Sequence, residues 1–133
     1  MRSGSALAMD AAEITDRVIL LKPAQLYRPG MSGTNLYDIT RGVWKVQRQR
    51  ASKASLAFAV VHGKVVEVYE IDDWHPANTT PYLSRRQDQA DPKYAKRFEF
   101  TGKVAPSGVR NKYLDQLVGH LFGSGQVILY VNC

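Results

Sequence analysis

Short apolar runs of strand-like composition alternate with polar turns along most of this chain. Residues 16–22 contain an unbroken apolar run from Val18 to Leu21 and stop at Pro23, which predicts a buried first strand. Two β-rich runs, 56–61 and 64–71, are joined only by His62-Gly63, which predicts a tight hairpin. Further strands are expected at residues 43–46, 97–101 and 126–131.

Two stretches have a helical pattern. Ser32 or Thr34 can cap a short helix that runs to Thr40, and Gly42 stands where a C-terminal glycine belongs. After Ser107, apolar residues share one helical face as far as Leu121: Val109, Tyr113, Leu114, Leu117, Val118 and Leu121. Residues 72–91 are polar and contain two prolines, which predicts a long loop.

This order of elements predicts an α+β fold, built as a small curved or closed β-barrel with two flanking helices. A chain of 133 residues is typical of one domain, which we place at residues 10–133. Residues 1–9 lack the apolar core of a signal peptide, and we interpret them as a cloning remnant or a disordered arm.

The charge balance is basic, with 18 Lys and Arg against 12 Asp and Glu, and a net charge of +6 favours polyanionic partners. One cysteine, Cys133, excludes an internal disulfide and a cysteine-based zinc site. Apolar runs fall far below the roughly 18 residues of a membrane span. Phosphate-loop, dinucleotide and zinc-protease motifs are absent. We therefore expect a soluble cytoplasmic protein with no cofactor, no metal and no membrane contact.

The basic residues gather in one segment, because no acidic residue lies between Ile39 and Val66. Lys and Arg side chains release counterions from nucleic acid, so such a segment predicts a phosphate-binding surface. Its candidate residues are Arg41, Lys45, Arg48, Arg50, Lys53 and, further along the chain, Arg97. The other interpretation is a solvated loop that keeps the protein soluble.

Aromatic residues lie close to these charges in the sequence. Aromatic faces beside cations can stack an unpaired or flipped base, and a few polar groups can then read its edge. We assign the stacking role to Trp44 and Trp74, the edge-reading role to Asp73 or Asn78, and a wall of the pocket to Tyr82. The alternative for either tryptophan is a place in the core.

Several strings together resemble a family of small bacterial proteins that stand alone or are joined to nuclease domains. They are YRPGM from residue 27, LYDITRGVWK from 36, VEVYEIDDWHP from 66, RFEF from 97 and YVNC from 130. The layout also looks like the PUA superfamily of ASCH, EVE and YTH-like domains, whose central barrel strands the hairpin at 58–68 resembles. That resemblance implies RNA or DNA binding and, as in EVE and YTH-like domains, an aromatic cage for a modified base.

The sequence thus predicts a nucleic-acid-binding module that takes DNA or RNA and holds a flipped base, plain or modified. Its expected setting is restriction, defence or repair, with a nuclease domain or subunit as partner. One alternative is an ASCH-like ribonuclease or small hydrolase that uses Lys45, Asp73 and His75. The other is a protein-interaction module whose basic surface docks an acidic partner.

Overall fold

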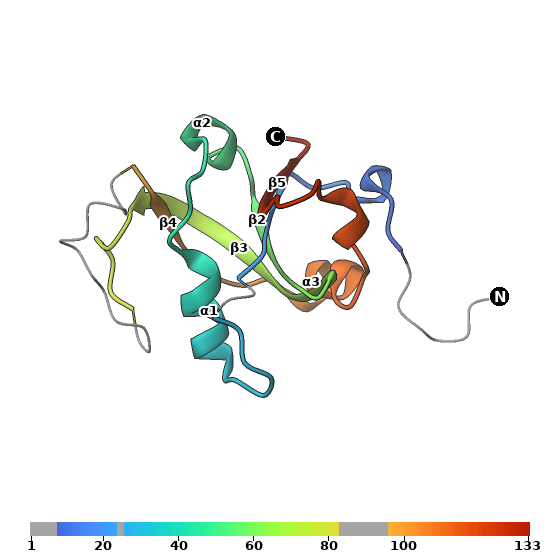
Figure 1. Ribbon diagram of the computed structural model, residues 1–133, viewed down its shortest axis with the longest axis horizontal. Helices are drawn as coiled ribbons and strands as arrows, with labels where there is room; N and C mark the ends of the chain where they lie inside the picture. Colours follow the sequence, from blue (N-terminus) through green and yellow to red (C-terminus); the bar gives the residue numbers. More distant parts are fainter. Residues whose placement is uncertain (1–7, 24–25, 83–95) are drawn as a thin grey trace.

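A single five-stranded sheet organises the molecule, and its strands stand in the order β4-β3-β2-β1-β5 (Figure 1). The computed structural model describes residues 8–23, 26–82 and 96–133. The strands are β1 Val18–Leu21, β2 Leu56–Val61, β3 Lys64–Pro76, β4 Phe98–Val104 and β5 Ile128–Val131. Only β1 and β2 pair in parallel, while every other pair is antiparallel. The α+β class is confirmed, but the sheet is open, so the prediction of a closed barrel is wrong.

The central strands β1 and β2 are buried on both faces, as their continuous apolar runs require. Because side chains alternate across a strand, Leu20 and Phe58 point to one core while Ile19 and Ala57 point to the other. Each fully buried Leu, Ile or Phe contributes roughly 1.5–3 kcal/mol of transfer free energy. Two cores of this kind explain how a small open sheet is stabilised.

Helices cover both faces of the sheet. The helices α1 Gly33–Arg41 and α2 Arg48–Ala51 pack on the core that contains Trp74. The helix α3 Ser107–Tyr113 and the 3₁₀ turn Gly119–Leu121 pack on the core that contains Phe58. The predicted cap of α1 is confirmed, because Ser32 Oγ accepts from the Asn35 N–H at 3.1 Å. No helix in the described part of the chain is long and apolar enough to cross a membrane.

The hairpin between β2 and β3 is confirmed, and its turn places both His62 and Gly63 at positive φ (51° and 76°). The strand β3 continues past Ile71 to Pro76, so the predicted loop at 72–91 starts too early. The extension forms because Trp74 pairs with Phe100 of β4. The remainder of that loop from residue 83 lies outside the described residues.

The helix predicted after Ser107 is shorter in the structure than its apolar stripe indicates. The helix α3 ends at Tyr113, and Asp115 adopts a φ of 66°, which no helix contains. Residues 115–118 instead hydrogen-bond to the β2–β3 hairpin, where the Asp115 N–H donates to Val65 O at 2.8 Å and the Val118 N–H donates to Gly63 O at 2.8 Å. Tertiary hydrogen bonds thus override the local pattern, while Val109, Tyr113, Val118 and Leu121 of the predicted stripe still pack on the core.

The segment between α1 and α2 also differs from its prediction. At 43–46 the expected strand reduces to a single bridge, in which Trp44 and Phe98 exchange both main-chain hydrogen bonds (2.9 and 2.8 Å). This bridge covers part of the outer edge of β4. The one-turn helix α2 has no counterpart among the predicted elements, because its residues carry no apolar periodicity.

Gly102 occupies the tightest point of the sheet. A Cβ atom there would lie 2.0 Å from the main-chain oxygen of Glu70, beside the irregular pairing of β3 with β4. We therefore expect Gly102→Ala to lower the free energy of unfolding by about 2–3 kcal/mol, measured by urea denaturation. Gly108→Ala is the matched control, since nothing lies within 4 Å of its added Cβ and alanine favours the helix. Equal stability of the two variants would contradict this packing.

Candidate nucleic-acid interface

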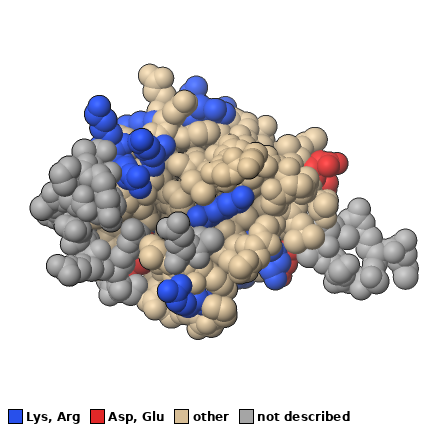
Figure 2. Space-filling model, viewed as in Figure 1, with Lys and Arg blue, Asp and Glu red and all other residues tan. Residues whose placement is uncertain are grey.

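Exposed cations gather at one end of the sheet. We call this set the basic ridge: Arg17, Lys45, Arg48, Arg50 and Lys53. Figure 2 shows Lys and Arg side chains along the edge of the molecule where Figure 1 places α2. The parallel pairing of β1 with β2 brings Arg17 to this segment, because Arg17 O accepts from the Ser55 N–H at 2.8 Å. Residues 48–53 and the start of β1 therefore share one surface.

The basic ridge has no acidic side chain beside it. Within the described residues, no Asp or Glu carboxylate lies within 4.0 Å of a ridge cation, and Arg50 donates to the main-chain oxygen of Cys133 at 2.8 and 3.0 Å. Several other surface cations are paired, for example Lys103 with Glu70 at 3.8 Å and Lys64 with Asp115 at 3.8 Å. Unpaired Lys and Arg side chains on one surface are the expected arrangement for contacts with phosphate.

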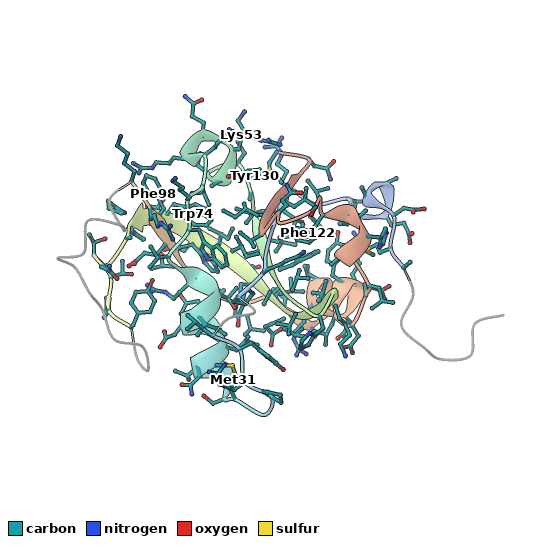
Figure 3. All side chains as sticks on the ribbon, in the orientation of Figure 1. Met31, Lys53, Trp74, Phe98, Phe122 and Tyr130 are labelled. Atoms are coloured by element: carbon teal, nitrogen blue, oxygen red, sulfur yellow. The ribbon has the colours of Figure 1, made fainter. Side chains whose placement is uncertain are left out.

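Aromatic rings hold the two arginines of α2 in place. The Arg48 guanidinium lies 5.7 Å from the centre of the Phe98 ring, and that of Arg50 lies 4.4 Å from the centre of the Tyr130 ring. Tyr130 is itself fixed, because its hydroxyl accepts from the Gln47 N–H at 2.7 Å. Figure 3 labels both rings and Lys53. A guanidinium resting on a ring loses less conformational freedom when it binds a phosphate.

The two tryptophans of the predicted base pocket differ in exposure. Trp74 is 2% exposed, packs edge-on against Phe100 with ring centres 5.4 Å apart, and donates its indole N–H to Ala51 O at 3.1 Å. Trp74 is therefore a core residue, and its ring does not reach the surface. Trp44 is only partly buried, and its indole N–H donates to Thr40 O at 2.7 Å. Asp73 is exposed, and its carboxylate accepts a hydrogen bond from the main-chain N–H of Trp74 at 2.8 Å.

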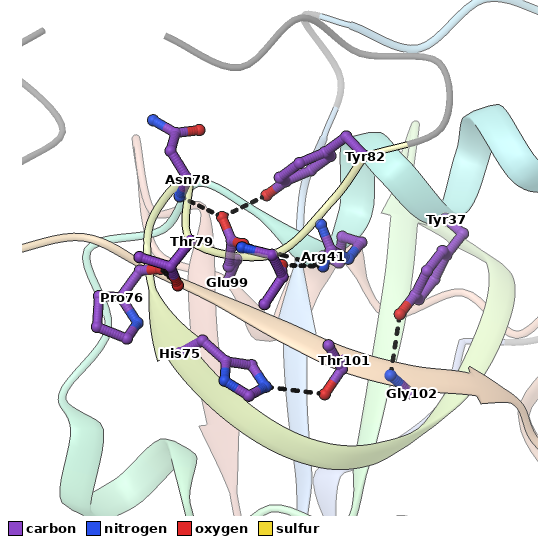
Figure 4. A network of polar contacts seen from close by, with 11 residues as sticks. Tyr37, Arg41, His75, Pro76, Asn78, Thr79, Tyr82, Glu99, Thr101 and Gly102 are labelled. Carbon is purple, nitrogen blue, oxygen red and sulfur yellow. Dashed lines mark hydrogen bonds and ion pairs between the residues drawn. The ribbon is translucent and has the colours of Figure 1, made fainter. Parts of the chain in front are cut away.

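Asn78, Tyr82 and Arg41 come together around the carboxylate of Glu99, which is completely buried (Figure 4). Glu99 accepts from the Asn78 N–H at 2.5 Å and from the Tyr82 hydroxyl at 2.9 Å. It also accepts from the main-chain N–H (2.9 Å) and the hydroxyl of Thr80. We call these residues the Glu99 cluster. It fixes residues 78–82 against β4.

Arg41 supplies the positive charge of the Glu99 cluster. It is 2% exposed, its Nη2 lies 3.9 Å from Glu99 Oε2, and its guanidinium stacks 4.1 Å from the centre of the Tyr82 ring. Its Nε and Nη1 atoms are buried and have no hydrogen-bond partner among the described residues. Arg41 thus lies in the interior and not on the basic ridge. Arg97 is partly buried, and its Nε also has no partner in the described part of the chain.

Among the described residues, no hydrogen bond or ion pair joins the three residues of the hydrolase alternative. His75 Nε2 lies 3.0 Å from Thr101 Oγ1, the Asp73 carboxylate accepts from the main-chain N–H of Trp74, and Lys45 is exposed on the basic ridge. In the described ranges, no group of three His, Cys, Asp or Glu side chains is arranged to hold a metal ion.

The Glu99 cluster makes a stability prediction. Glu99→Gln leaves Arg41 buried without an opposite charge, so we expect a loss of about 3–5 kcal/mol in the free energy of unfolding. The control Glu70→Gln breaks an exposed pair with Lys103 and should cost less than about 1 kcal/mol. Urea denaturation followed by tryptophan fluorescence measures both.

The double variant Arg41→Gln/Glu99→Gln completes this test. Removing both charges leaves neither unpaired, so the double variant should be more stable than Glu99→Gln alone. A double variant that loses the sum of both single effects would show that the two charges do not interact.

Sequence reasoning missed Arg17, Tyr130 and Glu99 as members of these two sites. The long-range contacts that bring these residues together leave no local pattern in the sequence. Glu99 is a partial exception, because it stands between Phe98 and Phe100 and a strand places its side chain on the opposite face from theirs. Comparisons with known protein families, with curated proteins and with solved structures found no match to this chain.

Proposed function

We propose that the protein is a nucleic-acid-binding module and that the basic ridge is its contact surface. The observation that carries this proposal is the surface shared by five exposed cations, none of which has an Asp or Glu carboxylate within 4.0 Å among the described residues. Phosphate contacts of this kind provide affinity without sequence choice.

Recognition of a flipped base, plain or modified, is the finer part of the proposal, and Trp44 is its stacking residue. Trp44 is the partly exposed tryptophan, and it directly precedes Lys45 of the basic ridge. Base stacking on an aromatic side chain contributes roughly 1–3 kcal/mol. A role in restriction, defence or repair beside a nuclease domain or subunit is consistent with these chemistries.

The contribution of the ridge is measured by fluorescence anisotropy with labelled DNA and RNA. We expect Lys45→Gln/Arg48→Gln to weaken binding about tenfold and to lower the salt slope by roughly 1–2, because phosphate contacts are lost. The control Lys64→Gln/Lys103→Gln removes the same charge from cations that already have acidic partners. If both variants weaken binding equally, net charge alone explains the loss of affinity, and the basic ridge is not a specific contact surface.

Trp44 is tested with probes that differ only in base methylation or hydroxymethylation. Trp44→Ala should reduce the preference for the modified probe more than it reduces affinity for the plain one, and Trp44→Phe should retain part of the preference. The ridge variant should do the reverse and weaken both probes alike. If Trp44→Ala and the ridge variant act identically at several salt concentrations, base stacking at Trp44 is excluded.

A further inference from the structure

A hollow of about 590 Å³ opens at the end of the sheet, lined by Arg17, Lys53, Asn132 and Cys133. Arg17 directly precedes β1, and Lys53 comes shortly before β2. Because these strands run parallel, both side chains are brought to the same end of the sheet. The antiparallel strand β5 ends there, which places Asn132 and Cys133 in the same hollow.

Two cationic side chains line the hollow. Neither Arg17 nor Lys53 has an Asp or Glu carboxylate within 4.0 Å among the residues that the structure describes. Arg50 lies at its side, where Nε and Nη2 donate to the main-chain oxygen of Cys133 at 3.0 and 2.8 Å. Arg50 is therefore already engaged, and the donors open to a ligand are those of Arg17 and Lys53.

The wall of the hollow is held by hydrogen bonds. Asn132 has a φ of 65°, a conformation that asparagine tolerates better than most residues. Its side-chain Nδ2 donates to Ile14 O at 2.8 Å and to Asp16 O at 2.9 Å, so the end of β5 is tied to the segment before β1. Such ties position Arg17 relative to Cys133 before any ligand arrives.

We infer that this hollow binds a phosphate group of the nucleic acid, with Arg17 and Lys53 as its ligands. The inference rests on the proposed function and adds to it the place where one phosphate is held. Two cationic side chains that line one open hollow match the charge of a phosphate and its several acceptor oxygens. The group can be a terminal phosphate or an internal phosphodiester, and probes with and without a 5′-phosphate distinguish them.

Cys133 provides a local reporter, because it is the only cysteine of the chain. Burial raises the pKa of its thiol, while Arg50, Arg17 and Lys53 act to lower it, and Tyr130 is the other ionisable group coupled to it. A phosphate in the hollow should cover the sulfur and cancel the field of these cations. Both effects slow alkylation by iodoacetamide.

The experiment compares the wild type, Arg17→Gln/Lys53→Gln and the control Lys64→Gln/Lys103→Gln with the same single-stranded oligonucleotide. We expect the hollow variant to bind about tenfold more weakly than the control, although both remove the same charge. Saturating oligonucleotide should slow Cys133 alkylation several-fold in the wild type and in the control, but not in the hollow variant. Thermal unfolding checks that all three proteins are folded.

The outcomes separate this inference from the proposed function. Protection of Cys133 by the 5′-phosphorylated probe alone assigns the hollow to a terminal phosphate, and equal protection by both probes assigns it to a phosphodiester. In another outcome, the wild type binds, Lys45→Gln/Arg48→Gln weakens binding, oligonucleotide gives Cys133 no protection, and the hollow variant binds as well as the control. That outcome overturns the phosphate site in the hollow but leaves the proposed function intact. If the wild type binds no oligonucleotide, the proposed function itself fails.

Discussion

The parallel pairing of β1 with β2 determines where the rest of the molecule must lie. Parallel neighbours cannot be joined by a tight turn, so residues 22–55 form a crossover that carries α1 and α2. Both helices pack on the same core, beside Ile19 and Ala57. Because β2 starts at the same end of the sheet as β1, the crossover returns to that end. The acid-free basic segment directly precedes β2 and therefore lies there. The basic ridge is thus a consequence of strand pairing as much as of composition.

The same constraint separates arginines that look alike in the sequence. Arg41 ends α1 beside β4 and is buried against Glu99, where its charge is compensated and its ring partner is Tyr82. Arg50 follows the bridge at Trp44 and emerges on the surface over Tyr130. A buried guanidinium requires an opposite charge, whereas the exposed guanidinium of Arg50 donates to the main-chain oxygen of Cys133. Position along the crossover therefore decides whether an arginine is buried in the interior or exposed on the basic ridge.

Local signals predicted the elements that local interactions determine. The hairpin at His62-Gly63 and the cap at Ser32 were readable because turn geometry and capping depend on a few neighbouring residues. The helix after Ser107 was predicted too long, because hydrogen bonds from Asp115 to the distant hairpin end it. Trp74 was placed in a loop because acidic residues and Pro76 surround it, although pairing with β4 makes it a strand residue.

The site residues were harder to predict for the same reason. Arg17 reaches the basic ridge through main-chain contacts with Ser55, and Glu99 gathers donors from residues 78–82; neither partnership has a signature in the sequence. The acid-free run predicts phosphate contacts for Arg41, Lys45, Arg48, Arg50 and Lys53, and the structure places all of them except Arg41 on the surface. A charged segment can thus be recognised in the sequence more directly than a pocket, which depends on tertiary contacts.

The rings beneath the ridge arginines indicate which side chains could provide affinity for phosphate and which could provide base selectivity. One face of Phe98 and one face of Tyr130 are covered by guanidinium groups, so these rings orient cations instead of offering that face to bases. Under the proposed function, such a surface would hold phosphates in a fixed pattern without a preference among bases. The proposed base selectivity then depends on Trp44, which directly precedes Lys45 and has no stacked cation among the described contacts. Affinity and selectivity are therefore assigned to different side chains, and substitutions can separate them.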